Sequence, residues 1–514
     1  MARFKEYNYD QDKLIPIRFS KQIVPGTFEY TLNYLIDQVI DVSVFEARFT
    51  NDETGAPAYD PALLLKIVLY AYSRGIISSR DIERACRENV IFMALSADTQ
   101  PHFTTIADFI SSMAAEIEPI FRDVLLHCDE LGLIGKQMFA IDGCKLPSNA
   151  SKEGSGTRAE LKKKQQKLER AVGRMLKVHR ERDGQALAPD VVEKERRYVR
   201  TLRRQIRKLK GWLSENDDKI GKSGKPIKSN LTDNESAKMK TSHGVIQGYD
   251  GIAAVDHKHQ IIVHARAYGA AQEHDLLLPT LEGIADNFAA MGQTAVFKGA
   301  TVTADSGFHT EKNLEQLQEH HIDAYIADRL MRKRDYRFAD ADKYRARSRK
   351  EKQQFLGTNK TFRNKDFVYD EARQTCLCPA GKSLYRNGSH HNLRGYQAVK
   401  FRGTKRDCGP CPLRRRCLKH PDQSEVRQVA FFQGKVDKQK FSHTEAMKQK
   451  IDSDAGKALY GQRLGVVEPV FGNHKNHGRD RFTLRGTIKV NIQWLLYSIV
   501  HNLGKIHVYG EGFT

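Results

Sequence analysis

Three acidic residues at separate places in this 514-residue chain could together bind divalent cations. Asp142 and Asp305 each follow an apolar run typical of a buried strand, and a glycine directly after Asp142 is expected to end its strand. Glu468 lies in a basic stretch near the end of the chain. Carboxylates gathered at strand ends are the oxygen ligands that Mg²⁺ prefers. Two such ions activate a water or a hydroxyl group and stabilise the leaving oxygen of a phosphodiester.

The surroundings of Glu468 leave two interpretations open. Gly465 before it and Pro469 after it predict that Glu468 lies in the first turn of a helix. Lys475, about two helical turns further on, would then share its face. Glu468 would bind a metal ion beside the two aspartates, or it would form an ordinary salt bridge with Arg463 or Lys475.

The overall charge favours a polyanionic partner. Lys and Arg total 84 against 63 acids, which gives a net charge of +21 and a pI near 9.5, and nucleic acid is the usual partner of such a protein. A merely basic soluble protein is the alternative. The chain has no apolar run of about 18 residues that could span a membrane, and its first residues lack the apolar core of a signal peptide. Eight cysteines in so long a chain do not form a secreted disulfide framework, so we expect a cytosolic protein.

Residues 1–125 are predicted to form a helical domain. Asp60, followed by a proline, is a helix start, and further helices are expected near Ser78 and Thr104. These short helices are typical of a helix-turn-helix-like DNA-binding module. A plain bundle used for packing or dimerisation fits the pattern as well.

Residues 135–328 are predicted to form an α/β core, interrupted by an insertion at 158–240. Near-heptad apolar spacing over 158–213 predicts a helical hairpin, and 214–240 reads as a flexible linker. Between Arg158 and Lys210 the chain has 19 Lys/Arg and 7 Asp/Glu. This imbalance indicates a DNA-contacting arm or a dimerisation stalk, whereas a solvated face is the plain alternative. The arginines expected to contact phosphates are Arg203, Arg204 and Arg207.

The rest of the core alternates strands and helices. No phosphate-binding loop, dinucleotide fingerprint or nucleophilic serine elbow occurs in the sequence. Residues 446–514 would complete the core with an apolar helix that contains Trp494. The expected elements before it are a hairpin over 248–265, a helix at 271–288, a strand at 300–304, a helix at 311–320 and a strand at 324–327.

Residues 329–445 form a second insertion, very basic over 329–352 and then rich in cysteine. Two interpretations of the cysteines remain open. Thiolates at this spacing suit a tetrahedral zinc site, with His420 as a substitute ligand, or they are free cytosolic thiols. The candidate ligands are Cys378, Cys408, Cys411 and Cys417.

In their order along the chain, these motifs resemble those of bacterial insertion-sequence DDE transposases. The sequences Ala-Ile-Asp142-Gly, Ala-Asp305-Ser-Gly-Phe and Val-Glu468-Pro-Val-Phe-Gly are similar to those around the family's three catalytic acids, and residues 59–109 resemble its helical N-terminal domain. One large subgroup carries a Y-R-E-K signature. The residues that resemble it are Tyr460, Arg463, Glu468 and Lys475, with four residues between arginine and glutamate where the signature has three.

The resemblance implies an RNase H-like mixed sheet flanked by helices, with a helical N-terminal domain, a helical-hairpin insertion and a cysteine-containing insertion. It implies that Asp142, Asp305 and Glu468 bind two Mg²⁺ ions, for which Mn²⁺ can substitute. Tyr460, Arg463 and Lys475 would contact DNA.

The implied activity is cleavage and strand transfer at the terminal inverted repeats of an insertion sequence. The implied partners are double-stranded repeat and target DNA and a second copy of the chain on that DNA, in the bacterial cytoplasm at the nucleoid. The alternatives are an inactive or domesticated DNA-binding relative and an RNase H-fold nuclease.

Overall fold

A computed structural model provides the structure, and its contacts divide the chain into two compact units. Unit 1 comprises Met1–Met331 and His443–Thr514, and unit 2 comprises Arg332–Ser442. The residues that the structure describes are 16–49, 57–181, 189–221, 224–338, 340, 361–388, 391–393, 396–435 and 442–512.

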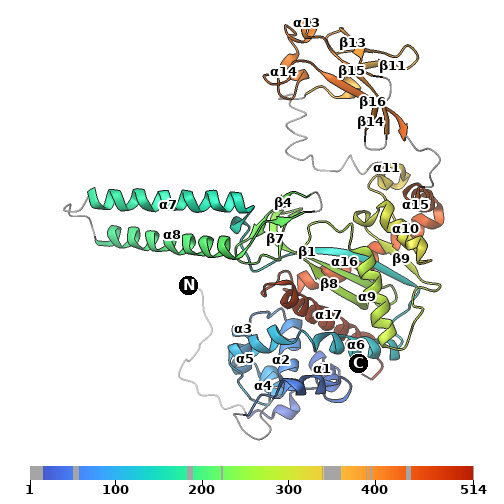
Figure 1. The fold of residues 1–514 in the computed structure, drawn as a ribbon. Helices are drawn as coiled ribbons and strands as arrows, with labels where there is room; N and C mark the ends of the chain where they lie inside the picture. The colour runs from blue at the N-terminus through green and yellow to red at the C-terminus, as the bar shows by residue number, and fades with distance from the viewer. Residues whose placement is uncertain are drawn as a thin grey trace, which may run out of the picture. The chain divides into compact units, whose positions relative to one another are not determined.

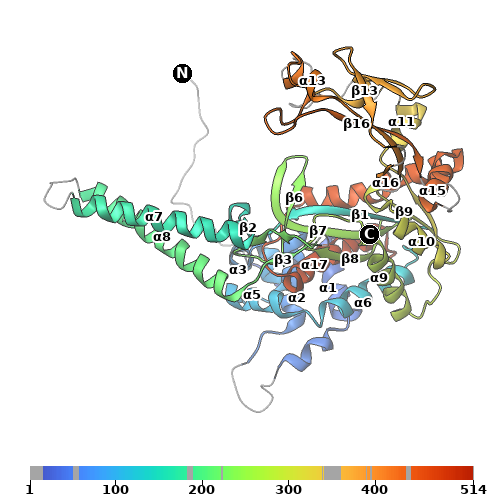
Figure 2. The ribbon, with the colours of Figure 1, turned by 45° about the horizontal axis from the view of Figure 1, so that its top comes forward.

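Three helices of unit 1 begin near Asp60, Ser78 and Thr104, where the sequence predicts them. The Asp60 side chain accepts a hydrogen bond from the Ala62 backbone N–H, and Pro61 is the first helical residue of α2. The helices are α1 (Phe28–Gln38), α2 (Pro61–Ser73), α3 (Ser79–Glu88), α4 (Val90–Leu95), α5 (Phe103–Ser112) and α6 (Ile117–Glu130). They share one apolar core with the sheet. The C-terminal helix α17 (Thr487–Tyr509) lies between them and the sheet (Figures 1 and 2).

The sheet of unit 1 is mixed and RNase H-like, as predicted. Its strands are β1 (Met138–Pro147), β6 (Ala237–Thr241), β7 (Gly244–Asp256), β8 (Ile262–Tyr268), β9 (Thr301–Ala304) and β10 (Asp323–Ile326). They run in the order β10-β9-β1-β7, and both β6 and β8 pair with β7. The pairs β1–β9 and β9–β10 are parallel, whereas β7 is antiparallel to its three neighbours. The other helices of this unit after the arm are α9 (Leu277–Ala290), α10 (Glu311–Glu319), α15 (His443–Asp452) and α16 (Asp454–Asn476).

The prediction of a flexible linker at 214–240 is wrong. This segment contains β3 (Lys219–Ile220), β4 (Pro226–Ile227), β5 (Ser229–Asn230) and β6. Its polar residues are held by partners distant in sequence. The buried Asn230 side chain donates to the Ser151 carbonyl and the Ser155 hydroxyl, and the Tyr249 hydroxyl donates to Asp233. Polar composition suggests a linker, but buried polar groups that are hydrogen-bonded do not need water.

The predicted helical hairpin is confirmed as α7 (Arg158–Glu181) and α8 (Pro189–Glu215), which lie side by side in Figure 1. Residues 182–188, between the two helices, lie outside the described residues. The apolar stripe of the hairpin is buried between its own two helices through Val172, Leu202 and Ile206. The apolar stripe therefore packs α7 against α8 of the same chain. The basic residues on the outer faces of the two helices remain exposed.

Unit 2 contains a six-stranded antiparallel sheet that the sequence analysis did not predict. Its strands are β11 (Val368–Asp370), β12 (Thr375–Leu377), β13 (Ser383–Arg386), β14 (His391–Leu393), β15 (Tyr396–Arg402) and β16 (Gln428–Lys435). The short helices are α11 (Met331–Arg334), which begins in unit 1, α13 (Lys405–Cys408) and α14 (Arg414–Cys417). Residues 332–442 have 29 Lys/Arg and 11 Asp/Glu. Within the predicted basic stretch 329–352, residues 339 and 341–352 lie outside the described part. In the described ranges, every helix is too short or too polar to span a lipid bilayer.

Candidate active site

Asp142 and Asp305 lie side by side in unit 1. Ile141 of β1 pairs with Ala304 of β9 in parallel register, and this is the last pair between the two strands. Asp142 is the next residue of β1, and Asp305 directly follows the end of β9. The prediction that β1 ends at Asp142 is wrong, because β1 continues to Pro147 along β7. Asp142 instead marks the point where pairing with β9 stops, so one edge of its strand is open there.

Arg463 of α16 joins the two aspartates. Its Nη1 lies 2.7 Å from Asp142 Oδ2, and its Nη2 lies 3.8 Å from Asp305 Oδ1. The guanidinium group is buried and lies 5.7 Å from the centre of the Tyr460 ring. Burial raises the pKa of Asp142 and Asp305 raises it further, whereas Arg463 and the Gly143 backbone N–H lower it. Arg463 therefore supplies the positive charge that two neighbouring carboxylates need.

A second pair of acids lies close to the first, and sequence reasoning missed it. Lys145 Nζ lies 3.1 Å from Glu273 Oε1. Asp250 is fully buried, and it lies opposite Lys145 in the antiparallel register of β1 and β7. Burial and the neighbouring Glu273 raise the pKa of Asp250, and the charge of Asp142 adds to this. Only weak sequence features could have indicated these two acids. Asp250 precedes a glycine, as Asp142 does, and Glu273 lies in the connection before α9.

Two glycines next to the predicted acids make room for this second pair. A Cβ atom on Gly143 would lie 2.8 Å from Asp250 Oδ1, and one on Gly307 would lie 2.7 Å from Glu273 Oε2. Both distances are shorter than real Cβ contacts, so a larger residue would displace the acids. The glycines in the Asp-Gly and Asp-Ser-Gly motifs therefore allow four carboxylates to gather.

The carboxylates outnumber the cations among these residues. Asp142 and Asp305 lie beside Arg463. Burial lowers the pKa of Lys145, but the charges of Glu273, Asp250 and Asp305 together raise it above its usual value. An excess of carboxylate oxygen is a donor set that suits a hard divalent cation. As the side chains lie, however, no group of three or more His, Cys, Asp or Glu residues within the described ranges could hold a metal ion.

Glu468 lies elsewhere on the helix that carries Arg463. The prediction of a first-turn position is wrong, because α16 begins at Asp454 and runs through Gly465 and Pro469 to Asn476. Burial of an apolar face that includes Val467 stabilises the helix despite its glycines and its proline.

The spacing of the signature explains the exposure of Glu468. Five positions after Arg463, Glu468 points about 140° away from it around the helix axis. The position that would share the face of Arg463 is occupied by the buried Val467. Glu468 is exposed, and so is Lys475, seven positions further on.

Two family models match the chain. Residues 377–507 match the model described as Transposase DDE domain, and residues 18–112 match the model described as Transposase domain (DUF772). Together the two matches indicate an insertion-sequence DDE transposase. No curated protein matches the chain. The second match spans α1 to α5, and the first includes Glu468 and the four candidate cysteine ligands, whereas Asp142 and Asp305 lie outside both. Membership of the subgroup with the Y-R-E-K signature stays a prediction.

The residues predicted to bind DNA differ in exposure in this transposase. Arg203, Arg204 and Arg207 are all exposed on α8. Lys475 is exposed as well and lies near the Cys144 thiol, whose pKa burial raises to about 11 while Lys475 acts in the opposite direction. Arg463 is buried against the aspartates. In the folded chain Arg463 therefore forms an ion pair with Asp142, and its contact with DNA stays a prediction.

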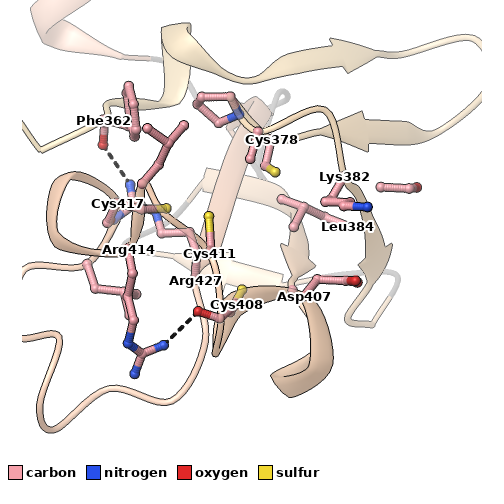
Figure 3. Close-up of a pocket in the computed structure, with 16 residues that line it drawn as sticks. Phe362, Cys378, Lys382, Leu384, Asp407, Cys408, Cys411, Arg414, Cys417 and Arg427 are labelled. Atoms are coloured by element: carbon pink, nitrogen blue, oxygen red, sulfur yellow. Dashed lines mark hydrogen bonds between the residues drawn. The ribbon is translucent and has the colours of Figure 1, made fainter.

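The four candidate zinc ligands of the transposase line a single cavity in unit 2. Figure 3 shows the sulfur atoms of Cys378, Cys408, Cys411 and Cys417 turned toward the same space. His420, the predicted substitute ligand, is exposed and does not line the cavity.

Proposed function

We propose that this transposase cuts DNA at the terminal inverted repeats of its insertion sequence and joins the cut ends to a target, with divalent cations bound by Asp142, Asp305 and Glu468. The observation that supports this most directly is the position of the two aspartates. They follow the last paired residues of β1 and β9 and share Arg463. Acids at this place in an α/β sheet are suited to bind a ligand beyond the strand ends.

Carboxylate oxygens are the ligands that magnesium prefers, and manganese is the expected substitute. Two such ions, when bound, activate a water or a 3′-hydroxyl group and stabilise the leaving oxygen of a phosphodiester. Asp142 and Asp305 would provide carboxylate oxygens from the strand side. Glu468 would provide one from α16 after a rearrangement of the helix, because in this structure it points about 140° away from Arg463. Arg463 offsets one of the two negative charges of the aspartates in the metal-free protein and would compete with a cation for Asp142. Asp250 and Glu273 add negative charge close by, which favours a divalent cation over an uncharged ligand.

Two basic regions are suited to hold the DNA. The arm of α7 and α8 has a surplus of 12 positive charges between Arg158 and Lys210, and residues 332–442 have a surplus of 18. Together these exceed the net charge of the whole chain, so the remainder of the protein is net acidic. Charge concentrated in this way is expected to contact phosphates, and such contacts make affinity depend on salt. Near the acids, Tyr460 and Lys475 would position the DNA end. A second copy of the chain would join on double-stranded DNA.

The test is the replacement Asp305→Asn, which keeps the size of the side chain and removes its charge. Cleavage and strand transfer of inverted-repeat DNA should fall by about two orders of magnitude or more, because metal-assisted charge stabilisation is worth several kcal/mol. Specific binding to the repeats should remain largely intact. Asp286→Asn, a change at an exposed position of α9, is the matched control and should keep full activity.

Other results would point elsewhere. Cleavage by Asp305→Asn at near the wild-type rate would remove Asp305 from the site. Wild-type protein that cleaves without joining ends to a target would be an RNase H-fold nuclease. Wild-type protein that binds the repeats and never cleaves them, in Mg²⁺ or Mn²⁺, would be an inactive relative.

A further inference from the structure

The cavity in unit 2 brings together cysteines from two parts of the chain. Cys378 follows β12, whereas Cys408 and Cys417 are the last residues of α13 and α14, and Cys411 lies between these helices. All four line a cavity of about 30 Å³. That volume has room for an ion or for one or two water molecules, not for an organic ligand.

Tight backbone turns direct these thiols into the cavity. The Cys378 N–H donates to the Lys382 carbonyl, and the Gly381 N–H donates back to the Cys378 carbonyl, at 2.9 and 2.8 Å. On the other side, Gly403 leaves space for Cys408, since a Cβ atom at Gly403 would lie 2.6 Å from Cys408 Sγ. A glycine is therefore required where this thiol enters.

Unit 2 also has little apolar core to hold it together. Among its described residues, the buried cluster contains six side chains, which are Phe367, Cys376, Leu384, Val399, Phe401 and Val429. Small folds with so little buried apolar surface commonly rely on a disulfide or a structural metal. All four cavity cysteines are free thiols in the structure.

We propose that Cys378, Cys408, Cys411 and Cys417 bind one structural Zn²⁺ ion that holds the turn after β12 against the α13–α14 segment. Four thiolates form the closed tetrahedral site that zinc favours over harder cations. Each ligating thiol gives up its proton to solvent as the ion binds. As they lie, the described side chains form no group that could hold a metal ion. Binding therefore draws the sulfur atoms inward, to about 2.3 Å from the zinc.

Two arginines at the cavity suit the charge that results. Zn²⁺ with four thiolates carries about two negative charges in excess. Arg414 and Arg427 both line the cavity. Arg414 Nη1 donates to the Cys408 carbonyl, and Arg427 Nη1 donates to the Cys417 carbonyl, at 2.9 and 3.1 Å. Both guanidinium groups are thus held next to ligand residues by hydrogen bonds to the backbone, as the outer partners of a metal site usually are.

The experiment measures zinc in the purified full-length protein after adventitious ions are removed. About one zinc per chain is expected, with release when a thiol reagent blocks the cysteines. Cys417→Ser should lose most of the zinc, whereas Cys417→His, which restores a zinc ligand, should recover it. Cys376→Ala is the matched control, because this thiol is buried in the core of unit 2 and does not line the cavity, so its zinc should stay.

Cobalt substitution gives a second measurement that does not depend on the folding of the variants. Wild-type protein refolded with Co²⁺ should show the visible absorption of a tetrahedral thiolate site. Zinc well below one per chain in wild-type protein supplied with zinc would overturn the proposal. So would equal zinc in wild type and Cys417→Ser, or a disulfide between any two of the four cysteines.

Discussion

Replacement of Arg463 by methionine should lower the free energy of unfolding of the metal-free protein by about 3 kcal/mol. Removing one partner of a buried ion pair costs about 3 to 5 kcal/mol, because the other charge stays buried without compensation. Asp142 has a side chain only 18% exposed and lies 2.7 Å from Arg463, so its contact carries most of the effect. Asp305 is 40% exposed and 3.8 Å away, so solvent screens its contact and the lower end of the range applies.

The assay is urea unfolding followed by tryptophan fluorescence, to which the fully buried Trp494 contributes. In EDTA, Arg463→Met should unfold at lower urea than wild type, and Arg463→Lys, which keeps a charge, should fall between them. Mg²⁺ should then stabilise Arg463→Met more than wild type, because no guanidinium group competes for Asp142. A cation at about 100 times its dissociation constant adds about 2.7 kcal/mol.

Two results would refute this reasoning. Equal stability of Arg463→Met and wild type in EDTA would mean that the ion pair contributes nothing to unit 1. A loss of stability in EDTA that Mg²⁺ restores no better than it stabilises wild type would keep the ion pair but remove the cation site from the two aspartates.

Two further predictions concern the arm and a buried histidine. Reversing the charges of Arg203, Arg204 and Arg207 should weaken DNA binding broadly and reduce the salt slope by about 0.9 for each phosphate that the arm no longer neutralises, and an unchanged slope would indicate a solvated surface or a dimerisation stalk. Burial lowers the pKa of His264 to about 4, so the unfolded chain takes up a proton there before the folded chain does, and stability should fall by about 2 kcal/mol between pH 6.5 and pH 5. Asp250, with its raised pKa, acts in the opposite sense, so the measurement is the difference between wild type and His264→Gln, and parallel pH profiles would contradict the assignment.

Local patterns in the sequence were sufficient to predict many of the helices and strands of unit 1. Asp60 before a proline predicted the start of α2, and near-heptad spacing predicted α7 and α8, because caps and apolar periodicity act between residues a few positions apart. The apolar runs before Asp142 and Asp305 likewise predicted two buried strands. The same signals misjudged 214–240, where polar residues form strands because distant groups satisfy their hydrogen bonds.

The chemistry of the candidate site depended on tertiary structure. Arg463 forms an ion pair with Asp142, which lies 321 residues earlier in the chain. No sequence pattern near either residue predicts that the two are partners. Asp250 and Glu273 join the site because Gly143 and Gly307 leave them space, which only the packed sheet shows.

By itself, then, the sequence indicated the hairpin of α7 and α8, the strands before Asp142 and Asp305, and three of the candidate acids. Which charged groups lie together, and on which face of α16 Glu468 lies, was decided by the folded chain. The physical reason is distance. Electrostatic and packing partners are chosen by proximity in space, and an insertion of one residue in a helix turns a side chain by about 100° without changing its local sequence signal.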